Sequence, residues 1–162
     1  MDVMKKIKLL NTYVNNVSMQ ETTDAIEALI HADKKSYVVA VNVDVIMKIE
    51  QDTLLKELTD KADMVLVDGK PLIWISKIHK KPIKAKISGS DLVPRLCEIS
   101  AKKGYTMFIL GGMDGIAEKA KKRLLNLPQR ALSFAWHTVR RRRATSGLNI
   151  LPKALPVPNP NL

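Results

Sequence analysis

The sequence predicts an α/β protein in which helices cover both faces of a parallel sheet. The first observation is a set of short runs of β-branched and other apolar residues, among them YVVAVN at 37–42 and MVLV at 64–67. Such continuous apolar runs are typical of strands that are buried on both faces. The second observation is that longer amphipathic patterns, typical of helices, separate these runs along residues 1–127. An alternation of strands and helices favours parallel pairing.

The predicted helices begin at recognisable capping residues. Ser18, followed three residues later by Glu21, has the pattern of a capping box and predicts a helix to about Ile30. Asp52 is a suitable N-cap for the segment TLLKELTDKA. Pro71 suits the first turn of a helix over LIWISKIHK, because its missing N–H would have no partner there.

The remaining elements complete one Rossmann-like α/β domain, residues 1–127. Ser90 is predicted to cap the helix DLVPRLCEISAKK, and Gly104 is predicted to end it as a C′ glycine. The other elements that we expect are a strand or hairpin arm at 7–14, a helix at 44–50, a strand at 105–110, a glycine loop at 111–115 and a helix at 116–126.

Composition excludes several classes of protein. No apolar run approaches the roughly 20 residues that a membrane span needs, and the segment MDVMKKIKLL lacks the long apolar region of a secretory signal. Cys97 is the single cysteine, so an internal disulfide is excluded. It falls in an amphipathic helical pattern, which favours a buried core thiol over a nucleophile. We therefore expect a reducing, cytoplasmic location.

The net charge of +11 divides unevenly, with +5 on residues 1–128 and +6 on residues 129–162, which hold no acidic residue. In the first segment the lysines are mixed with acidic residues and few aromatic residues accompany them. Such a mixture is typical of a solvent-exposed surface, which has some attraction for anionic lipid or phosphorylated substrates. Nucleic-acid recognition is not indicated.

Polar residues and glycines follow three of the predicted strands at the point where each strand ends. Asn42 follows YVVAV, Asp68-Gly69 follows MVLV, and Gly111-Gly112 follows YTMFIL. Each can be explained as a turn, since Asn, Asp and Gly are common turn residues. Parallel α/β sheets also bind ligands at the carboxyl ends of their strands, and right-handed crossovers place these three loops on one edge. Both interpretations stay open at this point.

Two helix starts are candidates for binding a phosphate or a sugar. The Gly111-Gly112 loop leads into a helix whose free N–H groups and dipole favour a phosphate, although its spacing alone is a weak signal. Gly89-Ser90-Asp91 opens another helix. A role of Ser90 as a helix cap alone explains that motif equally well. Asp91 would repel a phosphate, so we expect it to bind sugar hydroxyls or to take part in the cap.

Four segments in this order resemble the WecG/TagA/CpsF family of bacterial glycosyltransferases. They are VVAVNVD at 38–44, VDGKP at 67–71, ISGSDL at 87–92 and FILGG at 108–112, and the resemblance covers about residues 7–127. It implies an inverting transfer of a sugar, commonly N-acetylmannosamine, from a UDP donor to an undecaprenyl-diphosphate-linked sugar. The products implied are teichoic acid, capsule or a related cell-surface polymer.

The resemblance also implies roles for individual residues. Asp68 would be the general base that takes the proton of the acceptor hydroxyl, and Asn42 would position the sugar. The residues predicted to bind the substrates are Asn42, Gly69, Gly89, Ser90, Asp91, Gly111 and Gly112. The sequence departs from the family at Ala40, where the family usually has a threonine whose hydroxyl contact is then lost.

We expect no metal or other cofactor. No D-x-D motif, which holds Mg²⁺ or Mn²⁺ against the diphosphate in many other transferases, occurs in the sequence. Helix dipoles and basic side chains would then supply the counter-charge. The expected partners are the nucleotide sugar and the lipid-linked acceptor, with peripheral association at the inner face of the cell membrane. A homo-oligomer is compatible with this interpretation.

Residues 128–162 depart from the pattern of the family. This segment is basic and rich in proline towards its end, it contains RRRR at 140–143, and we expect it to be disordered. Our hypothesis is a shift of reading frame near residues 127–130, so that the C-terminal part of the sheet is missing. The alternative is a genuine basic tail that binds anionic lipid or nucleic acid. A chain without that part could also be an inactive remnant that retains only a nucleotide-sugar cleft.

Overall fold

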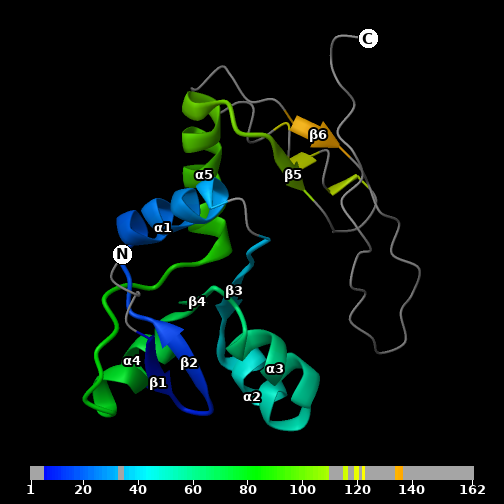
Figure 1. Ribbon diagram of the computed structural model, residues 1–162. Coiled ribbons are helices and arrows are strands. Elements are labelled where there is room, and N and C mark those ends of the chain that lie inside the picture. Colours follow the sequence, from blue (N-terminus) through cyan, green and yellow to red (C-terminus); the bar gives the residue numbers. More distant parts are fainter. Residues whose placement is uncertain are drawn as a thin grey trace, which may run out of the picture. The chain divides into compact units, whose positions relative to one another are not determined.

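The computed structural model describes residues 6–32, 35–109, 115, 116, 119, 120, 122 and 134–136. The chain divides into two compact units, Met1–Leu96 and Cys97–Leu162. The elements in chain order (Figure 1) are β1 (Lys6–Leu9), β2 (Thr12–Asn15), α1 (Met19–His31), β3 (Val38–Val41), α2 (Val43–Gln51), α3 (Thr53–Asp60), β4 (Met64–Val67), α4 (Lys70–Ile78), α5 (Gly89–Lys103), β5 (Met107–Ile109) and β6 (Phe134–Trp136).

The segment 7–14, which we predicted as one strand or one hairpin arm, instead contributes to both arms of an N-terminal hairpin. β1 and β2 are antiparallel, with Leu9 opposite Thr12. Leu10, in the tight turn between them, has a φ of 53°, which suits the left-handed backbone of a short hairpin turn. The buried Asn15 holds the hairpin to the next sheet, because its Oδ1 accepts a hydrogen bond of 2.8 Å from Val65 N.

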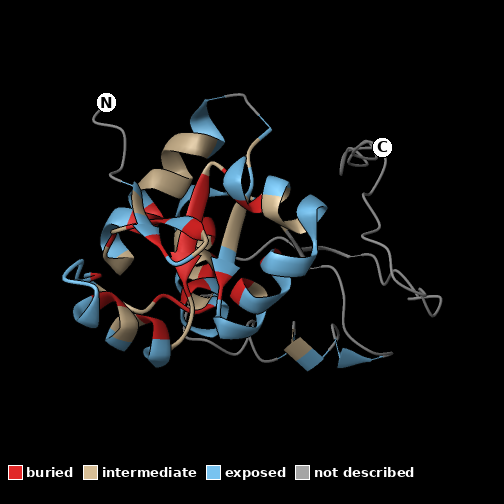
Figure 2. Ribbon diagram, turned by 90° about the horizontal axis from the view of Figure 1, so that it is seen from below, coloured by how far each residue is buried: buried red, intermediate tan, exposed pale blue. Residues whose placement is uncertain are grey.

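The β3–β4 pair is parallel, as predicted. The register places Val38 opposite Met64 and Val41 opposite Val67. All the residues of β4 are buried, and Figure 2 shows buried residues in the strands at the centre of the first unit. A strand buried on both sides explains why its sequence is continuously apolar rather than alternating.

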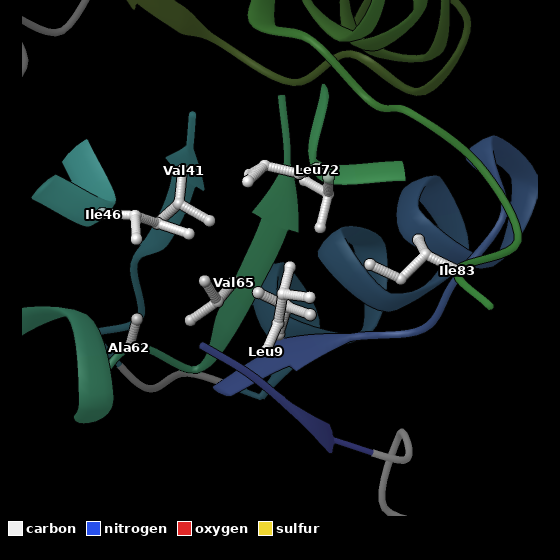
Figure 3. Close-up of a cluster of buried hydrophobic side chains, with 9 residues drawn as sticks. Leu9, Val41, Ile46, Ala62, Val65, Leu72 and Ile83 are labelled. Atoms are coloured by element: carbon white, nitrogen blue, oxygen red, sulfur yellow. The ribbon is translucent and has the colours of Figure 1, made fainter. Parts of the chain in front are cut away.

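Two hydrophobic clusters lie against opposite faces of β4. Val65 and Val67 belong to the first cluster with Leu72 of α4 and Ile46 of α2 (Figure 3). Successive side chains of a strand point to opposite faces.

The other face of β4 carries the second cluster. Met64 and Leu66 belong to it with Leu92 of α5, and Ala25 and Ile26 of α1 pack against it. Helices therefore cover both faces of this sheet, which confirms the predicted fold class.

Several predicted caps are confirmed. Ser18 Oγ accepts a hydrogen bond from Glu21 N at 3.3 Å, and Ser18 N donates to Glu21 Oε2 at 2.7 Å, so the capping box at α1 is complete. Asp52 Oδ1 accepts from Leu55 N at 2.9 Å and caps α3. Gly104 follows α5 with a φ of 73°, the left-handed conformation that a C′ glycine provides.

The prediction that Ser90 caps α5 was wrong. The helix begins at Gly89, and Leu92 N donates to Ser88 O at 2.9 Å, so Ser88 is the residue that precedes the first turn. Ser90 lies one residue inside the helix. Ser88 followed by Asp91 has the same spacing as a capping box, and this pattern was the better start signal.

The capping carboxylate of α1 makes the stability of the protein depend on pH. Hydrogen bonds from Lys84 and from Ser18 lower the pKa of Glu21 from 4.5 to about 2. A carboxylate with a lowered folded-state pKa stabilises the fold above the unfolded pKa, and this contribution is lost as the pH falls towards the folded pKa. We expect wild type to have the higher free energy of unfolding. Its difference from Glu21→Gln should have its full value above pH 4.5 and should vanish towards pH 2.

Urea unfolding followed by circular dichroism over this pH range measures the difference. Glu50→Gln, which removes an exposed carboxylate of α2, is the control. A gap between wild type and Glu21→Gln that stays constant down to the lowest pH would contradict the assignment.

In the second unit, β5 and β6 form a parallel pair, with Met107 opposite Phe134. β6 falls within 128–162, so these three residues depart from the expected disorder, while the rest of that segment lies outside the described residues. Cys97 is buried, as predicted, and burial raises the pKa of its thiol. In the part of the chain that the structure describes, no helix is both long and apolar enough to cross a bilayer.

Candidate active site

The structure brings Asn42 and Asp68 side by side, although they are 26 positions apart in the sequence. Val41 and Val67 are opposite each other at the ends of parallel β3 and β4. The N–H of Asp68 donates to the carbonyl of Val41 at 2.8 Å, which extends the pairing by one residue. Neighbouring strands lie ~4.8 Å apart, so both side chains start from the same carboxyl edge of the sheet.

A third segment reaches this edge from the other side of β4. The N–H of Ile87 donates to the carbonyl of Val67 at 2.8 Å. Ile87 is followed directly by Ser88 and by the start of α5 at Gly89. The backbone of Asp68 is therefore flanked by the end of β3 and by the segment that leads into α5.

Three helices begin at this edge, one after each of the three segments. They are α2 at Val43, α4 at Lys70 and α5 at Gly89. The first turn of a helix carries free N–H groups and the positive end of its dipole. The edge can therefore accept negative charge, as a diphosphate requires.

Asn42 caps α2 and still has one polar group available. Its Oδ1 accepts a hydrogen bond of 2.9 Å from Val45 N. The side chain is exposed, and its amide nitrogen makes no hydrogen bond with the residues described here. The side-chain oxygen of Asn42 thus caps the helix, as the turn interpretation expects. Its side-chain nitrogen can still donate a hydrogen bond to a ligand.

Asp68 presents a half-buried carboxylate at the centre of this edge. No residue of the described ranges forms a hydrogen bond or an ion pair with its carboxylate oxygens. Gly69 then takes a φ of 134° and a ψ of 139° before α4 begins. This backbone conformation is rare for residues with a side chain. The Asp-Gly pair thus connects β4 to α4 as a turn, and among the described residues the Asp68 carboxylate has no hydrogen-bond or ion-pair partner.

The start of α5 holds a small polar network. Asp91 Oδ2 accepts a hydrogen bond of 2.7 Å from Lys86 Nζ and another from Ser88 Oγ. The hydrogen bond from Lys86, followed by that from Ser88, lowers the pKa of Asp91, which keeps it ionised at neutral pH. Ser90 Oγ lies 2.9 Å from Ser88 Oγ and belongs to the same network. A Cβ at Gly89 would meet nothing within 4 Å, so the space above it is open.

A sequence model of the glycosyl transferase WecG/TagA/CpsF family matches residues 7–141 of the chain. The chain belongs to this family. The match extends beyond residue 127, where we placed the boundary of the α/β domain.

The chain is also similar to a curated bacterial protein. It is the N-acetylglucosaminyldiphosphoundecaprenol N-acetyl-beta-D-mannosaminyltransferase of Bacillus spizizenii, which is 25% identical over 108 residues. The matched region covers 67% of this chain and 40% of the relative. The chain thus corresponds to well under half the length of the relative that it matches.

Part of the predicted site falls outside the description. Gly111 and Gly112 lie outside the described residues. Ala40, at which the resemblance implies the loss of a hydroxyl contact, is exposed on β3. Within the described ranges, no group of three or more His, Cys, Asp or Glu side chains could hold a metal ion.

Two members of the polar network were not assigned a role from the sequence. Lys86 gave no local signal, because a lysine in a loop is common. The contact of Ser88 with Asp91 could have been found from their three-residue spacing, which is that of a capping box.

Proposed function

We propose that the protein transfers N-acetylmannosamine or a similar sugar from a UDP donor to an undecaprenyl-diphosphate-linked sugar in cell-surface polymer synthesis. The observation that carries this proposal is the position of Asp68 at the carboxyl edge of the sheet. The N–H of Asp68 donates to the carbonyl of Val41, and the carbonyl of Val67 just before it accepts from the N–H of Ile87. Membership of a glycosyltransferase family supports the reaction class. The name of the Bacillus spizizenii relative supports the donor and acceptor classes.

In the proposed reaction, the acceptor hydroxyl oxygen attacks the anomeric carbon of the donor sugar from the side opposite the diphosphate. The bond from that carbon to the diphosphate oxygen breaks, UDP leaves, and the configuration is inverted. The hydroxyl proton passes to the Asp68 carboxylate, which no described residue occupies. The free amide nitrogen of Asn42 donates to a hydroxyl or acetamido oxygen of the sugar.

Negative charge that develops on the leaving diphosphate needs a counter-charge. The N-termini of α2 and α4, which begin beside Asn42 and Asp68, are proposed to supply positive potential there. Asp91 neutralises part of the Lys86 charge and accepts hydrogen bonds, which suits sugar hydroxyls better than phosphate. Gly111-Gly112, to which the family resemblance assigns a part in binding the substrates, lie outside the described residues.

Because the proposed acceptor is linked to a membrane lipid, we propose a peripheral location at the inner face of the cell membrane. The test is a transfer assay with UDP-N-acetylmannosamine and a lipid-linked N-acetylglucosamine acceptor. It uses this chain and a hybrid that joins residues 1–127 to the remaining length of the Bacillus spizizenii relative. Transfer by the hybrid supports the proposal. UDP binding without transfer by either protein would favour the inactive remnant.

We expect turnover to survive EDTA. The sequence has no D-x-D motif, so the counter-charge for the diphosphate is proposed to come from helix N-termini and lysine. The rate of sugar transfer in the hybrid should be the same in EDTA and in buffer. A rate that falls in EDTA and recovers with Mg²⁺ or Mn²⁺ would reveal a cation site and contradict the expectation.

A further inference from the structure

The outer face of α4 combines exposed apolar residues with lysines. Trp74 is 62% exposed and Ile78 is 78% exposed, and both point away from the core that holds Leu72 and Ser76. They are one helical turn apart and therefore share a face of the helix. An exposed tryptophan next to an exposed isoleucine on a basic helix is typical of a surface that enters a membrane interface.

The segment around this helix carries no acidic residue. Between Asp68 and Asp91 the sequence holds six lysines and no Asp or Glu. Lys84 pairs with Glu21, and Lys86 pairs with Asp91. The other four lysines, Lys70, Lys77, Lys80 and Lys81, are exposed, and none of them forms an ion pair with a carboxylate in the described part of the chain.

These lysines differ from those on the helices nearby. Lys48, Lys56 and Lys61 each pair with a carboxylate four residues earlier or later on the same helix. We predicted that lysines and acidic residues are mixed throughout residues 1–128. This prediction is confirmed on α2 and α3, but it is wrong around α4. An uncompensated positive field remains at this surface.

A depression at the C-terminal end of α4 adds further positive charge. It has a volume of about 530 Å³, and its lining includes Lys80 and Lys81, which follow the helix, together with Lys6 and Lys8 of β1. Its size and charge suit the phosphate head groups of lipids. We call the following residues the α4 surface: Lys70, Trp74, Lys77, Ile78, Lys80 and Lys81.

We propose that the α4 surface docks the protein on an anionic phospholipid bilayer, with Trp74 and Ile78 entering the interface and the lysines contacting lipid phosphates. Charge complementarity favours a bilayer over a second copy of this basic chain. The α4 surface lies on the helix that follows Asp68-Gly69 and on the residues directly after that helix. The inference deepens the proposed membrane location, but binding to vesicles does not require sugar transfer.

The test uses the full chain with Trp136→Phe, which leaves Trp74 as the single tryptophan. Vesicles of phosphatidylglycerol mixed with phosphatidylcholine should shift the Trp74 emission to shorter wavelength, and brominated lipids should quench it. Phosphatidylcholine vesicles alone should do neither. Binding by the basic segment 128–162 alone would sediment the protein with vesicles but leave the Trp74 emission unchanged, and this outcome would overturn the proposal.

Matched variants separate the α4 surface from general charge. Lys77→Glu with Lys81→Glu should weaken vesicle binding by about tenfold or more. Lys35→Glu with Lys102→Glu changes the net charge equally at exposed sites elsewhere and should have a clearly smaller effect. Ile78→Ser should weaken binding, whereas Met47→Ser on α2, where Met47 is 62% exposed, should not. Equal effects within either pair would overturn the proposal.

A second copy of the chain is the competing occupant. If Trp74 emits at short wavelength without vesicles, and the protein elutes as a dimer whose population rises with concentration, the surface is a subunit interface and the proposal fails. If the hybrid transfers no sugar while Trp74 of this chain still inserts into vesicles, the proposed reaction is wrong and the docking proposal stands.

Discussion

Asp68→Asn is expected to lower the rate of sugar transfer in the hybrid by at least about a hundredfold, the usual scale for a lost general base. The amide keeps the size of the side chain and its place after β4, but it cannot take the acceptor proton. The fold should survive, because no described residue forms a hydrogen bond with the carboxylate that the mutation removes. The single-turnover rate at saturating donor and acceptor is the measurement.

Asp52→Asn is the matched control for this prediction. It makes the same chemical change at an N-cap on α3, where asparagine caps as well as aspartate. We expect its transfer rate to match that of the parent hybrid. A folded Asp68→Asn variant that also keeps the parental rate would remove Asp68 from the mechanism.

Gly69→Ala is expected to destabilise the fold of this chain. Gly69 has a φ of 134° and a ψ of 139°, a conformation that residues with a side chain rarely adopt. The added Cβ would meet only Pro71 Cδ at 3.6 Å, an ordinary contact, so the effect comes from the backbone rather than from a clash. We expect a loss of about 1–3 kcal/mol in the free energy of unfolding, measured by urea unfolding with circular dichroism.

Gly89→Ala tests whether this loss comes from the conformation of Gly69. Gly89 is the first residue of α5, its φ is not positive, and its Cβ would meet nothing within 4 Å. Alanine there should leave the free energy of unfolding unchanged or raise it by up to about 1 kcal/mol. Equal losses at Gly69 and Gly89 would contradict the assignment of backbone strain to the turn after Asp68.

Local signals in the sequence were sufficient for much of the fold. The strand Met64–Val67 was predicted with its observed bounds, because a continuous apolar run between turn residues leaves few alternatives. The caps at Ser18 and Asp52 were found because a capping hydrogen bond joins residues three apart. The family resemblance rested on ordered local motifs and was confirmed over residues 7–141.

The candidate site could be predicted only in part. Asp68 and Asn42 were expected on one edge from the parallel topology, and the structure places them there. The contact of Lys86 with Asp91, and the start of α5 at Gly89, were missed. Ser88 and Ser90 are both good capping residues, and only the packing of α5 onto β4 decides between them. The roles of Asp68 and of the substrate-binding residues remain predictions.

The sequence by itself determined the order of strands and helices, the parallel sheet and the family, because these follow from local patterns and their succession. Only the tertiary structure decided which side of α4 faces the core. LIWISKI is almost wholly apolar, yet Trp74 is exposed while Ser76 is buried. Ser76 Oγ donates to Ile73 O and accepts from Ile83 N, so its burial leaves no polar group unsatisfied. Ile73 is a local partner within α4, but the contact with Ile83 depends on the path of the chain after the helix, and no local pattern contains that path.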